Sequence, residues 1–384
     1  MAKCVMVLYP DPLNGYPPKY ARDGIPVLAS YPDGSSLPTP SKIDFTPGEM
    51  LGCVSGALGL QEFFEDGGHE LVVTSDKDGP DSEFEHHLPD ADIVISQPFW
   101  PAYITKERFA KAPKLKLALT AGIGSDHVNL DEARARGVTV AEETYSNSIS
   151  VAEHAVMQIL ALVRNFIPSH RWAATGGWNI ADCVSRAYDI EGMDVGVIAA
   201  GRIGRAVLQR MKPFGVHLHY FDVHRLPLEV ENDLGVTYHR DVESLAAAVD
   251  VVSIHSPLIA QTHHMFNEKL LSKMRRGSYI VNTARAEETD QKAIVAALES
   301  GQLAGYAGDV WYPQPPPPDH PWRIMANNAM TPHVSGTTLS AQARYAAGTR
   351  EILEDWFAGR PIRSEYLIVE GGKFAGTGAA SYEQ

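Results

Sequence analysis

A glycine-containing turn in the middle of the chain is typical of a dinucleotide-binding site. A β-branched run at residues 195–199 leads through Gly201 and Gly204 into a helical pattern, with Ala199 in the first glycine place of the G-x-G-x-x-G fingerprint. Gly201 would let the backbone approach a pyrophosphate at the helix N-terminus, and Gly204 would let helix and strand pack closely. Because Ala199 departs from the fingerprint, a merely structural turn is the alternative.

An acidic residue stands where such a site binds the adenine ribose. Asp222 follows Gly204 by 18 residues, close to the spacing of about 20 that the fingerprint requires. Its carboxylate would accept hydrogen bonds from the ribose hydroxyls and repel a 2′-phosphate, so the sequence favours NAD over NADP. His224 and Arg225 are close enough in sequence to weaken that preference, and a strand-end cap is the structural alternative for Asp222.

Three side chains with catalytic chemistry follow later strand-like runs. Arg285, Gln314 and His333 each come after a predicted strand, so we expect them at the carboxyl edge of the sheet, where ligands bind. A guanidinium group binds a carboxylate through two parallel N–H donors, and an imidazole can hold positive charge beside an anion. A single Arg or His at a strand end is usually a surface or capping group, and only their joint placement indicates a site.

Other chemistries find little support in the sequence. The adjacent histidine pairs at residues 86–87 and 263–264 lack metal-ligand spacing, and His217 and His219 have no nearby cysteine or group of acids, so we expect no metal site. The Gly-x-Ser-x-Gly pattern of a nucleophilic serine does not occur.

Short β-branched runs alternate with helical patterns, which indicates an α/β fold with parallel sheets and crossover helices. Long helices are expected from Ser150 to about Phe166, where Ser150 and Glu153 form a capping-box pattern, and over residues 338–357. Residues 11–47 are rich in Gly, Pro, Ser and Asp without periodicity, as in a functional or mobile loop. Buried strands are expected at residues 4–8, 71–74, 93–96, 115–120, 138–141, 195–199, 217–222, 251–254, 278–282 and 304–310.

This order of elements predicts two doubly wound parallel-sheet, Rossmann-like domains. Residues 1–147 and 335–384 would form the substrate domain, and residues 148–334 would form an NAD-binding domain inserted into it. The two long helices would be the connections.

Composition restricts the class of protein further. With 384 residues, 44% hydrophobic and 21% charged, the chain is expected to be a globular protein of two or three domains rather than a disordered or membrane protein. A formal charge of −14 argues against binding nucleic acid, which needs clustered Lys and Arg. An anionic small substrate is compatible, because one Arg in a cleft overrides the overall field locally. Three cysteines without Cys-x-x-Cys spacing, and no signal or transit peptide pattern, favour the cytoplasm.

Several motifs along the chain carry a family resemblance. They are Ile43-Asp-Phe-Thr-Pro-Gly48, Ser75-Asp-Lys-Asp-Gly-Pro-Asp81, Gln97-Pro-Phe-Trp-Pro101, Ala121-Gly-Ile-Gly-Ser-Asp-His127, Asn147-Ser-Ile-Ser-Val-Ala-Glu-His154 and Gly176-Gly-Trp-Asn179. With them the chain resembles, over essentially its whole length, the D-2-hydroxyacid dehydrogenase superfamily and, within it, the NAD-dependent, metal-free formate dehydrogenases. The resemblance implies NAD as cofactor, formate as substrate, a homodimer, and hydride transfer that yields CO₂ and NADH.

The resemblance also implies a role for each candidate residue. Arg285 would bind formate through its guanidinium fork, and Asn147 would donate an amide hydrogen to the other oxygen. The backbone of Ile123 would line the pocket, and Phe99 would help to exclude water. The residues that would contact NAD are Ser148, Ala199, Gly201, Arg202, Ile203, Gly204, Asp222, Ser256, Pro257, Leu258, Thr283, Asp309, His333, Ser335 and Gly336.

Gln314 discriminates between two enzyme hypotheses. Relatives that oxidise hydroxy acids typically carry Glu there, which tunes the histidine for moving the hydroxyl proton. Formate oxidation releases no such proton, so a neutral amide that orients His333 is sufficient, and the catalysis is electrostatic. The alternatives are a D-2-hydroxyacid dehydrogenase and a non-enzymatic, NAD-sensing corepressor. The acidic composition and the full set of Arg285, Asn147 and His333 disfavour the corepressor.

The chain departs from the family pattern near the expected site. Ala286 stands where members usually have glycine, and if that glycine needs a positive φ, Ala286 must move the loop. Glu287 and Glu288 follow, and two added carboxylates near an anionic pocket would weaken formate capture. Ile259 replaces a frequent His, and Ser256 replaces Cys or Ala, which removes an oxidation-prone thiol.

Overall fold

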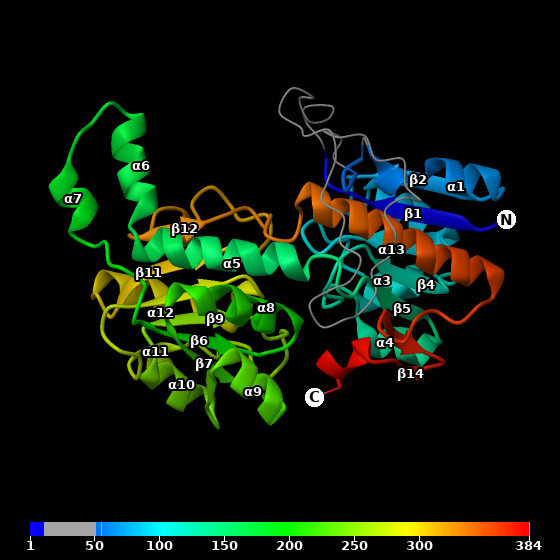
Figure 1. The fold of residues 1–384 in the computed structure, drawn as a ribbon. Coiled ribbons are helices and arrows are strands. Elements are labelled where there is room, and N and C mark those ends of the chain that lie inside the picture. The colour runs from blue at the N-terminus through cyan, green and yellow to red at the C-terminus, as the bar shows by residue number, and fades with distance from the viewer. Residues whose placement is uncertain (11–50, 55, 384) are drawn as a thin grey trace. The chain divides into compact units, whose positions relative to one another are not determined.

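The chain forms two compact units, each built around its own sheet (Figure 1). The structure is a computed structural model that describes residues 1–10, 51–54 and 56–383. Unit 1 comprises Met1–Asn147 and Gly336–Gln384, and unit 2 comprises Ser148–Ser335. Ser335 lies one residue beyond the boundary expected from the sequence, because its backbone N–H is bound by Asp309 of unit 2. The predicted loop at residues 11–47 and the motif at residues 43–48 lie outside the described residues.

The sheet of unit 1 has the strand order β14-β13-β5-β4-β3-β1-β2. Five of its strands pair in parallel at the places that the β-branched runs predict: β1 (Lys3–Val7), β2 (Glu70–Thr74), β3 (Ile93–Ser96), β4 (Leu117–Thr120) and β5 (Thr139–Glu142). The sequence analysis missed β13 (Leu367–Glu370) and β14 (Lys373–Phe374) in the C-terminal tail. β13 pairs antiparallel with β5, and β14 pairs antiparallel with β13 at the edge of the sheet.

Both faces of the unit 1 sheet are covered, because alternate side chains of its strands pack in two opposite cores. Cys4 and Met6 of β1 pack in one core with α1 (Gln61–Asp66) and α13 (Leu339–Ala358). Val5 and Val7 pack in the opposite core with α2 (Glu83–His87), α3 (Lys106–Lys111) and α4 (Leu130–Arg136). Successive side chains of a strand point to opposite faces, so a continuous apolar run is what a sheet covered on both sides requires.

The sheet of unit 2 is entirely parallel, with the order β12-β11-β10-β9-β6-β7-β8. The chain order reverses between β6 and β9, which makes their carboxyl ends the topological switch point. The strands are β6 (Asp194–Ile198), β7 (His217–Phe221), β8 (Val236–Tyr238), β9 (Val251–Ile254), β10 (Ser278–Asn282), β11 (Leu303–Gly308) and β12 (Asn328–Met330).

Helices cover both faces of the unit 2 sheet. One core joins α5 (Ser148–Val163), α8 (Arg202–Met211) and α9 (Leu228–Leu234) to Val195, Val197 and Val251. The opposite core joins α10 (Val242–Ala248), α11 (Glu268–Leu271) and α12 (Gln291–Glu299) to Ile198 and Val252. The predicted α/β class with two predominantly parallel, Rossmann-like sheets is therefore confirmed.

The start of α5 differs from the capping-box prediction. The helix begins at Ser148, so Ser150 lies buried inside the first turn rather than at the N-cap, and Glu153 forms an ion pair with Arg210 at 3.3 Å. The helix ends at Val163, and Asn165, at φ 51°, separates it from α6 (Phe166–Ala174). After α6 and α7 (Ile180–Val184), which extend away from the sheet in Figure 1, the chain returns to β6.

Among the described residues, none of the helices combines the length and the apolar character that crossing a membrane requires.

Candidate functional site

The residues that follow the strands of unit 2, including several predicted site residues, gather at one edge of its sheet. Directly after the carboxyl ends of six parallel strands come Ala199 (β6), Asp222 (β7), His255 (β9), Thr283 (β10), Asp309 (β11) and Thr331 (β12). Arg285, Gln314 and His333 lie a few residues further along the loops after β10, β11 and β12. Because all the strands are parallel, these ends share one edge, where ligands bind in such sheets.

The turn after β6 has the geometry of a phosphate cradle. Ala199 adopts φ 66°, the left-handed conformation of the first fingerprint glycine, at a cost of about 1 kcal/mol. A Cβ at Gly204 would lie 2.1 Å from the Ala199 carbonyl oxygen, so only glycine allows this packing of α8 on β6. Gly201 is the N-cap of α8, and a Cβ there would meet open space. The backbone is thus open to a pyrophosphate at the helix N-terminus, and the residues present fit a dinucleotide.

Asp222 is held by the backbone on both sides. Its Oδ2 accepts from the Ala200 N–H and its Oδ1 from the His224 N–H, both at 2.8 Å. Arg225 turns away to a bidentate pair with Glu231, at 2.8 Å for each hydrogen bond. This pairing lowers the pKa of Glu231 to about 2, so the Arg225 charge is matched by a carboxylate. Because Arg225 is paired in this way, it attracts a 2′-phosphate less than the sequence alone suggests.

Two hydroxyl groups of the predicted NAD contacts are buried without a partner. Ser148 Oγ and Thr283 Oγ1 make no hydrogen bond within the described part of the chain. Burying a hydroxyl without a hydrogen-bond partner costs free energy, so these two hydroxyls fit a site that binds a polar ligand. Ser335 is also buried, while Arg202, Ile203 and Leu258 are partly exposed, and the Pro257 carbonyl accepts from the Thr262 hydroxyl at 2.7 Å.

His333 and Gln314 are brought into direct contact, as the sequence analysis expects. His333 Nδ1 lies 2.8 Å from Gln314 Oε1, and because that oxygen only accepts, Nδ1 carries the hydrogen. The backbone of His333 is left-handed, with φ 57°. A non-glycine residue in this region needs support from its surroundings, and the support comes from Asp309.

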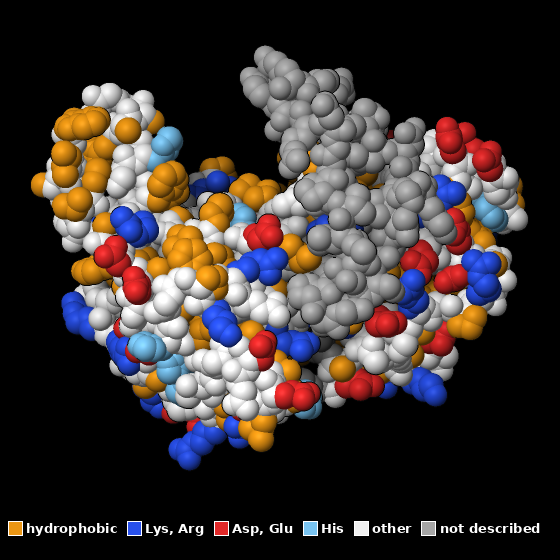
Figure 2. Space-filling view, viewed as in Figure 1, with side chains coloured by type: hydrophobic (Ala, Val, Ile, Leu, Met, Phe, Trp, Pro, Cys, Tyr) orange, Lys and Arg blue, Asp and Glu red, His pale blue; other side chains and the backbone are white. Residues whose placement is uncertain are grey.

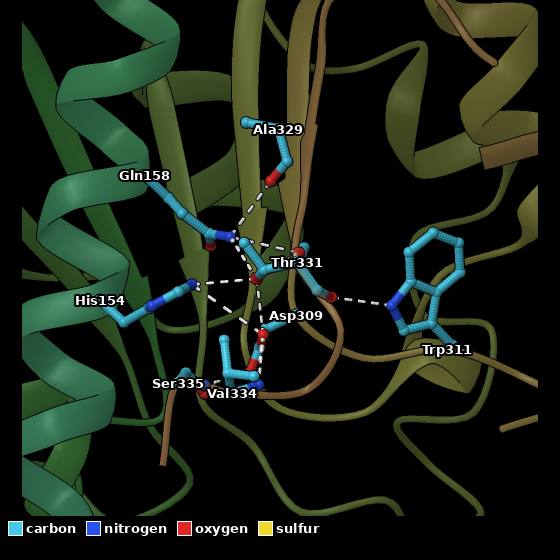
Figure 3. Close-up of polar contacts among 9 residues, drawn as sticks. His154, Gln158, Asp309, Trp311, Ala329, Thr331, Val334 and Ser335 are labelled. Carbon is cyan, nitrogen blue, oxygen red and sulfur yellow. Dashed lines mark hydrogen bonds and ion pairs between the residues drawn. The ribbon is translucent and has the colours of Figure 1, made fainter. Parts of the chain in front are cut away.

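Asp309 holds the loop that carries His333 (Figure 3). Its fully buried carboxylate accepts from the N–H of Val334 at 2.9 Å and of Ser335 at 2.7 Å, the two residues after His333. It also accepts from the Thr331 hydroxyl at 2.5 Å, two residues before it. Both ends of the left-handed turn are therefore attached to one carboxylate.

Helix α5 anchors the same loop from the other side. His154 Nε2 lies 3.0 Å from Thr331 Oγ1 and 4.0 Å from the Asp309 carboxylate. Burial lowers the pKa of His154 below its usual value although the charge of Asp309 acts to raise it, so His154 is neutral at pH 7. Because the Thr331 hydroxyl donates to Asp309, His154 Nε2 donates to Thr331. Gln158 Nε2 donates to the carbonyls of Gly308 and Ala329, each at 3.2 Å, which ties the ends of β11 and β12 together.

Arg285 lies in the loop after β10. It is half-buried, with Nη1 donating to the Ala284 carbonyl at 2.9 Å. The next residue, Ala286, starts a short 3₁₀ helix, η6 (Ala286–Glu288), and has no positive φ, so its backbone is not left-handed.

The expectation that two negative charges are added near the anionic pocket is wrong for Glu288. It is fully buried, and its Oε2 is hydrogen-bonded to the Ser256 hydroxyl. Burial raises its pKa to about 8, against the lowering effects of Ser256 and of the Arg285 charge. Glu288 is therefore neutral at pH 7, and Glu287, which is partly exposed, is the carboxylate that the sequence adds there.

Unit 1 contains the remaining predicted residues. Asn147 is buried, its Oδ1 has no hydrogen-bond partner among the described residues, and its amide packs against Gly336, where a Cβ would lie 2.6 Å from Nδ2. The turn before Asn147 is held by Arg344 of α13, whose Nε donates to the Ser146 carbonyl at 2.5 Å. Phe99 is half-buried against the core of α1 and α13.

Ile123 lies in a loop of unit 1 whose backbone needs glycine. Gly122 and Gly124 flank it with φ 144° and 111°. The Gly124 N–H donates to Glu142 at 3.2 Å, which holds the loop near the end of β5.

Residues 156–335 match the family described as D-isomer specific 2-hydroxyacid dehydrogenase, NAD binding domain. The whole chain is 66% identical over 384 residues to a formate dehydrogenase of Pseudomonas sp. (strain 101), covering 100% of this chain and 96% of that protein. The chain belongs to the formate dehydrogenase family. The family resemblance and the choice of NAD as cofactor are thereby confirmed, and the matched segment lies within unit 2.

Two solved structures of formate dehydrogenases are similar to the chain. One, from Granulicella m., has a TM-score of 0.95 and 68% identity, covering 98% of this chain and 100% of that chain. The other is an NAD-dependent formate dehydrogenase from Staphylococcus aureus in complex with NAD. It has a TM-score of 0.79 and 38% identity, covering 96% of this chain and 99% of that chain.

The sequence analysis missed part of the site. It quoted the motif that contains His154 without giving that residue a role, and it did not select Gln158, Thr331 or Glu288 as positioning residues. The contacts of these side chains join segments far apart in the chain. Only the apolar spacing around Gln158 gave a sign, because a polar residue facing a buried sheet must find partners there.

Proposed function

We propose that this protein catalyses the NAD-dependent oxidation of formate to CO₂ by direct hydride transfer. The observation that carries the proposal is the hydrogen bond of His333 to a neutral amide, Gln314, at the carboxyl edge of a dinucleotide-binding sheet. Formate has no hydroxyl proton to lose, so its oxidation needs no carboxylate beside the imidazole to accept or return a proton.

The residues of this chain supply binding and electrostatics. We propose that the Arg285 guanidinium binds the formate carboxylate through paired N–H donors, and that Asn147 donates an amide hydrogen to it. The backbone of Ile123 and the ring of Phe99 are proposed to line the pocket and exclude water. NAD, when bound, accepts the hydride at its nicotinamide ring. His333 is held by Gln314 and by the Asp309 loop, and it presents Nε2 as a donor when the imidazole is protonated.

The NAD site is proposed to use the whole carboxyl edge of unit 2. Gly201 and the N-terminus of α8 would bind the pyrophosphate, and Asp222 would accept from the adenine ribose. Asp309 has one oxygen, Oδ2, that accepts a single hydrogen bond within the described ranges of the chain, from the Ser335 N–H. A second lone pair of that oxygen is available to accept from the nicotinamide carboxamide, as the resemblance implies.

We also propose a homodimer that acts in the cytoplasm, in formate catabolism. Helices α6 and α7 have no buried residues, and Figure 2 shows hydrophobic side chains gathered over them. Trp178, in the turn between them, is 87% exposed. A second copy of the chain is the proposed cover for this surface, since contiguous exposed apolar groups mark interaction sites. Cys4, Cys53 and Cys183 are all free, in keeping with a reducing compartment.

The test of the activity is an assay of NADH formation with formate against a panel of D-2-hydroxy acids, with NADP in place of NAD as a second arm. We expect NADH from formate and little from the hydroxy acids. A higher kcat/KM for a hydroxy acid would favour the D-2-hydroxyacid dehydrogenase alternative. NAD binding without turnover of any substrate would favour the corepressor alternative.

A further inference from the structure

Glu288 joins the loops of unit 2 that carry proposed NAD and formate contacts. It ends η6, directly after Arg285 and Ala286, and its side chain reaches Ser256 after β9. The Phe266 N–H donates to its backbone carbonyl at 3.0 Å, so the backbone is fixed as well. The carboxyl group is 0% exposed, and its Oε1 has no hydrogen-bond partner within the described part of the chain.

These surroundings favour a neutral carboxylic acid at neutral pH. An unpartnered carbonyl oxygen costs less in a buried site than an unpartnered carboxylate oxygen. Burial raises the pKa of Glu288 to about 8, so the proton is lost just above neutrality.

The protonation of Glu288 decides the direction of its hydrogen bond to Ser256. A neutral Glu288 can donate through Oε2 to Ser256 Oγ, which leaves the serine hydrogen for another acceptor. An ionised Glu288 has no hydrogen, so Ser256 must donate to it. Each arrangement satisfies the contact between the two oxygens, but only the first lets Ser256 donate elsewhere.

We propose that Glu288 is a positioning residue for NAD, and that the proton it holds determines whether the Ser256 hydroxyl donates to the bound cofactor or to Glu288. This rests on the proposed function and on the NAD contact that the sequence analysis expects of Ser256. The neutral form of Glu288 binds NAD more tightly, and NAD affinity falls as Glu288 ionises. Loss of one neutral hydrogen bond corresponds to a dissociation constant on the order of three- to tenfold higher.

Arg285, Tyr306 and His255 keep their charge states just above neutral pH, so Glu288 is the group that changes its charge there. Arg285 stays protonated at all relevant pH values, and its charge acts to lower the pKa of Glu288, while Glu287 acts to raise it. Tyr306, from β11, has its pKa raised to about 12 by burial, and burial lowers the pKa of His255, beside Ser256, to about 3. The loop between β9 and α11 contacts η6 through the backbone N–H of His264, which donates to the Glu287 carbonyl at 2.7 Å. The ring of His263 stacks on that of His264.

The experiment measures NAD binding by titration calorimetry at about pH 7 and about pH 9, on either side of this pKa. We expect the parent to lose affinity three- to tenfold at the higher pH. Glu288→Gln, whose amide donates to Ser256 at every pH, should keep the affinity of the lower pH throughout. Ser256→Ala should be weak at both pH values. Glu287→Gln removes a neighbouring carboxylate that acts to raise the pKa of Glu288, so as the control it should keep the transition and at most move it to lower pH.

A transition in NAD affinity that persists in Glu288→Gln would overturn the proposal. That result, together with lowered stability, is what a purely structural role of Glu288 would give. If that variant does not fold, Ser256→Ala and infrared difference spectra of the parent decide instead. The spectra should show a protonated carboxyl band lost between the two pH values, and its absence rejects the proposal. A parent that binds NAD with this transition but does not oxidise formate would reject the proposed function and not the role of Glu288.

Discussion

At the scale of single residues, His333 donates through Nδ1 to the Gln314 amide oxygen at 2.8 Å, so its partner carries no charge. A carboxylate in the same place would favour the imidazolium and would add negative charge beside a site that must hold an anion. The choice between amide and acid at position 314 therefore separates hydride transfer from formate from the reactions that also move a hydroxyl proton.

Gln314→Glu tests this argument directly. We expect formate oxidation to become pH-dependent, highest where the new Glu is protonated and falling as the pH rises through its pKa, because the ionised form repels formate. Reduction of glyoxylate should improve, since that reaction needs a proton for the new hydroxyl. The measurement is a pH–rate profile of both reactions.

The control for that profile is Gln291→Glu, which places the same carboxylate beside a different histidine, His320, 3.0 Å from Gln291 Nε2. It should leave both profiles as in the parent. An unchanged formate profile and no gain with glyoxylate in Gln314→Glu would mean that Gln314 does not tune His333.

Asp222→Gln tests the choice of cofactor. Removing the carboxylate ends its repulsion of a 2′-phosphate, so the ratio of kcat/KM for NADP to that for NAD should rise roughly tenfold or more. Because Arg225 is paired with Glu231, a further rise is expected when Glu231→Gln is added and the guanidinium is released. Glu229→Gln, an exposed carboxylate on the same helix, is the control. A ratio that does not move in Asp222→Gln would show that Asp222 does not face the ribose.

At the scale of elements, the loop after β12 depends on β11 and α5. Asp309, at the end of β11, binds the backbone after His333, and Thr331 passes a hydrogen bond from His154 of α5 to Asp309 (Figure 3). The left-handed φ of His333 is therefore maintained by contacts with β11 and α5 rather than by the loop alone.

Thr331→Val removes the hydroxyl from the middle of this chain of hydrogen bonds and keeps the shape of the side chain. We expect a loss of about 1–3 kcal/mol in the free energy of unfolding, because His154 and Asp309 both lose a buried partner. The rate of formate oxidation should fall more than the affinity for NAD, since the displaced residue is His333. The measurements are urea unfolding and a comparison of kcat with KM. Thr237→Val, an exposed threonine on β8, is the control and should change neither quantity appreciably.

Elements with strong local patterns could be predicted, and those that depend on distant partners could not. The strands Ile93–Ser96, Val251–Ile254 and Ser278–Asn282 have the predicted bounds because each is a short apolar run that both faces of a sheet bury. Strand β13 pairs antiparallel with β5, which is far from it in sequence, so its short run appeared only as part of a tail. The capping-box prediction was wrong because a Ser-x-x-Glu spacing also occurs inside a helix.

The candidate site shows the same division. Arg285, Gln314 and His333 could be placed at one sheet edge from the strands that precede them. The roles of His154 and Glu288 depend on the register of α5 and η6 against the sheet, which no local pattern contains. Burial also reversed the expected effect of Glu288, from an added negative charge to a neutral acid at pH 7.

At the scale of the whole molecule, the surface over α6 and α7 is the feature that the isolated chain leaves unexplained. Both helices lie on unit 2 and have no buried residues, and the charge of −14 keeps the rest of the surface polar. A two-fold dimer would cover this surface with the same surface of a second copy, so that each apolar contact occurs twice.

Ile180→Glu with Val184→Glu tests this arrangement, since the two residues are one turn apart on α7 and both are well exposed. We expect the parent to sediment as twice the 41.9 kDa chain and the double variant to dissociate roughly tenfold or more readily, because two carboxylates would be desolvated in the interface. Leu228→Glu, an exposed leucine on α9 of the same unit, should leave the mass unchanged. A parent that sediments as a monomer, or a double variant that associates as tightly as the parent, would place the partner of α6 and α7 outside a second copy of this chain.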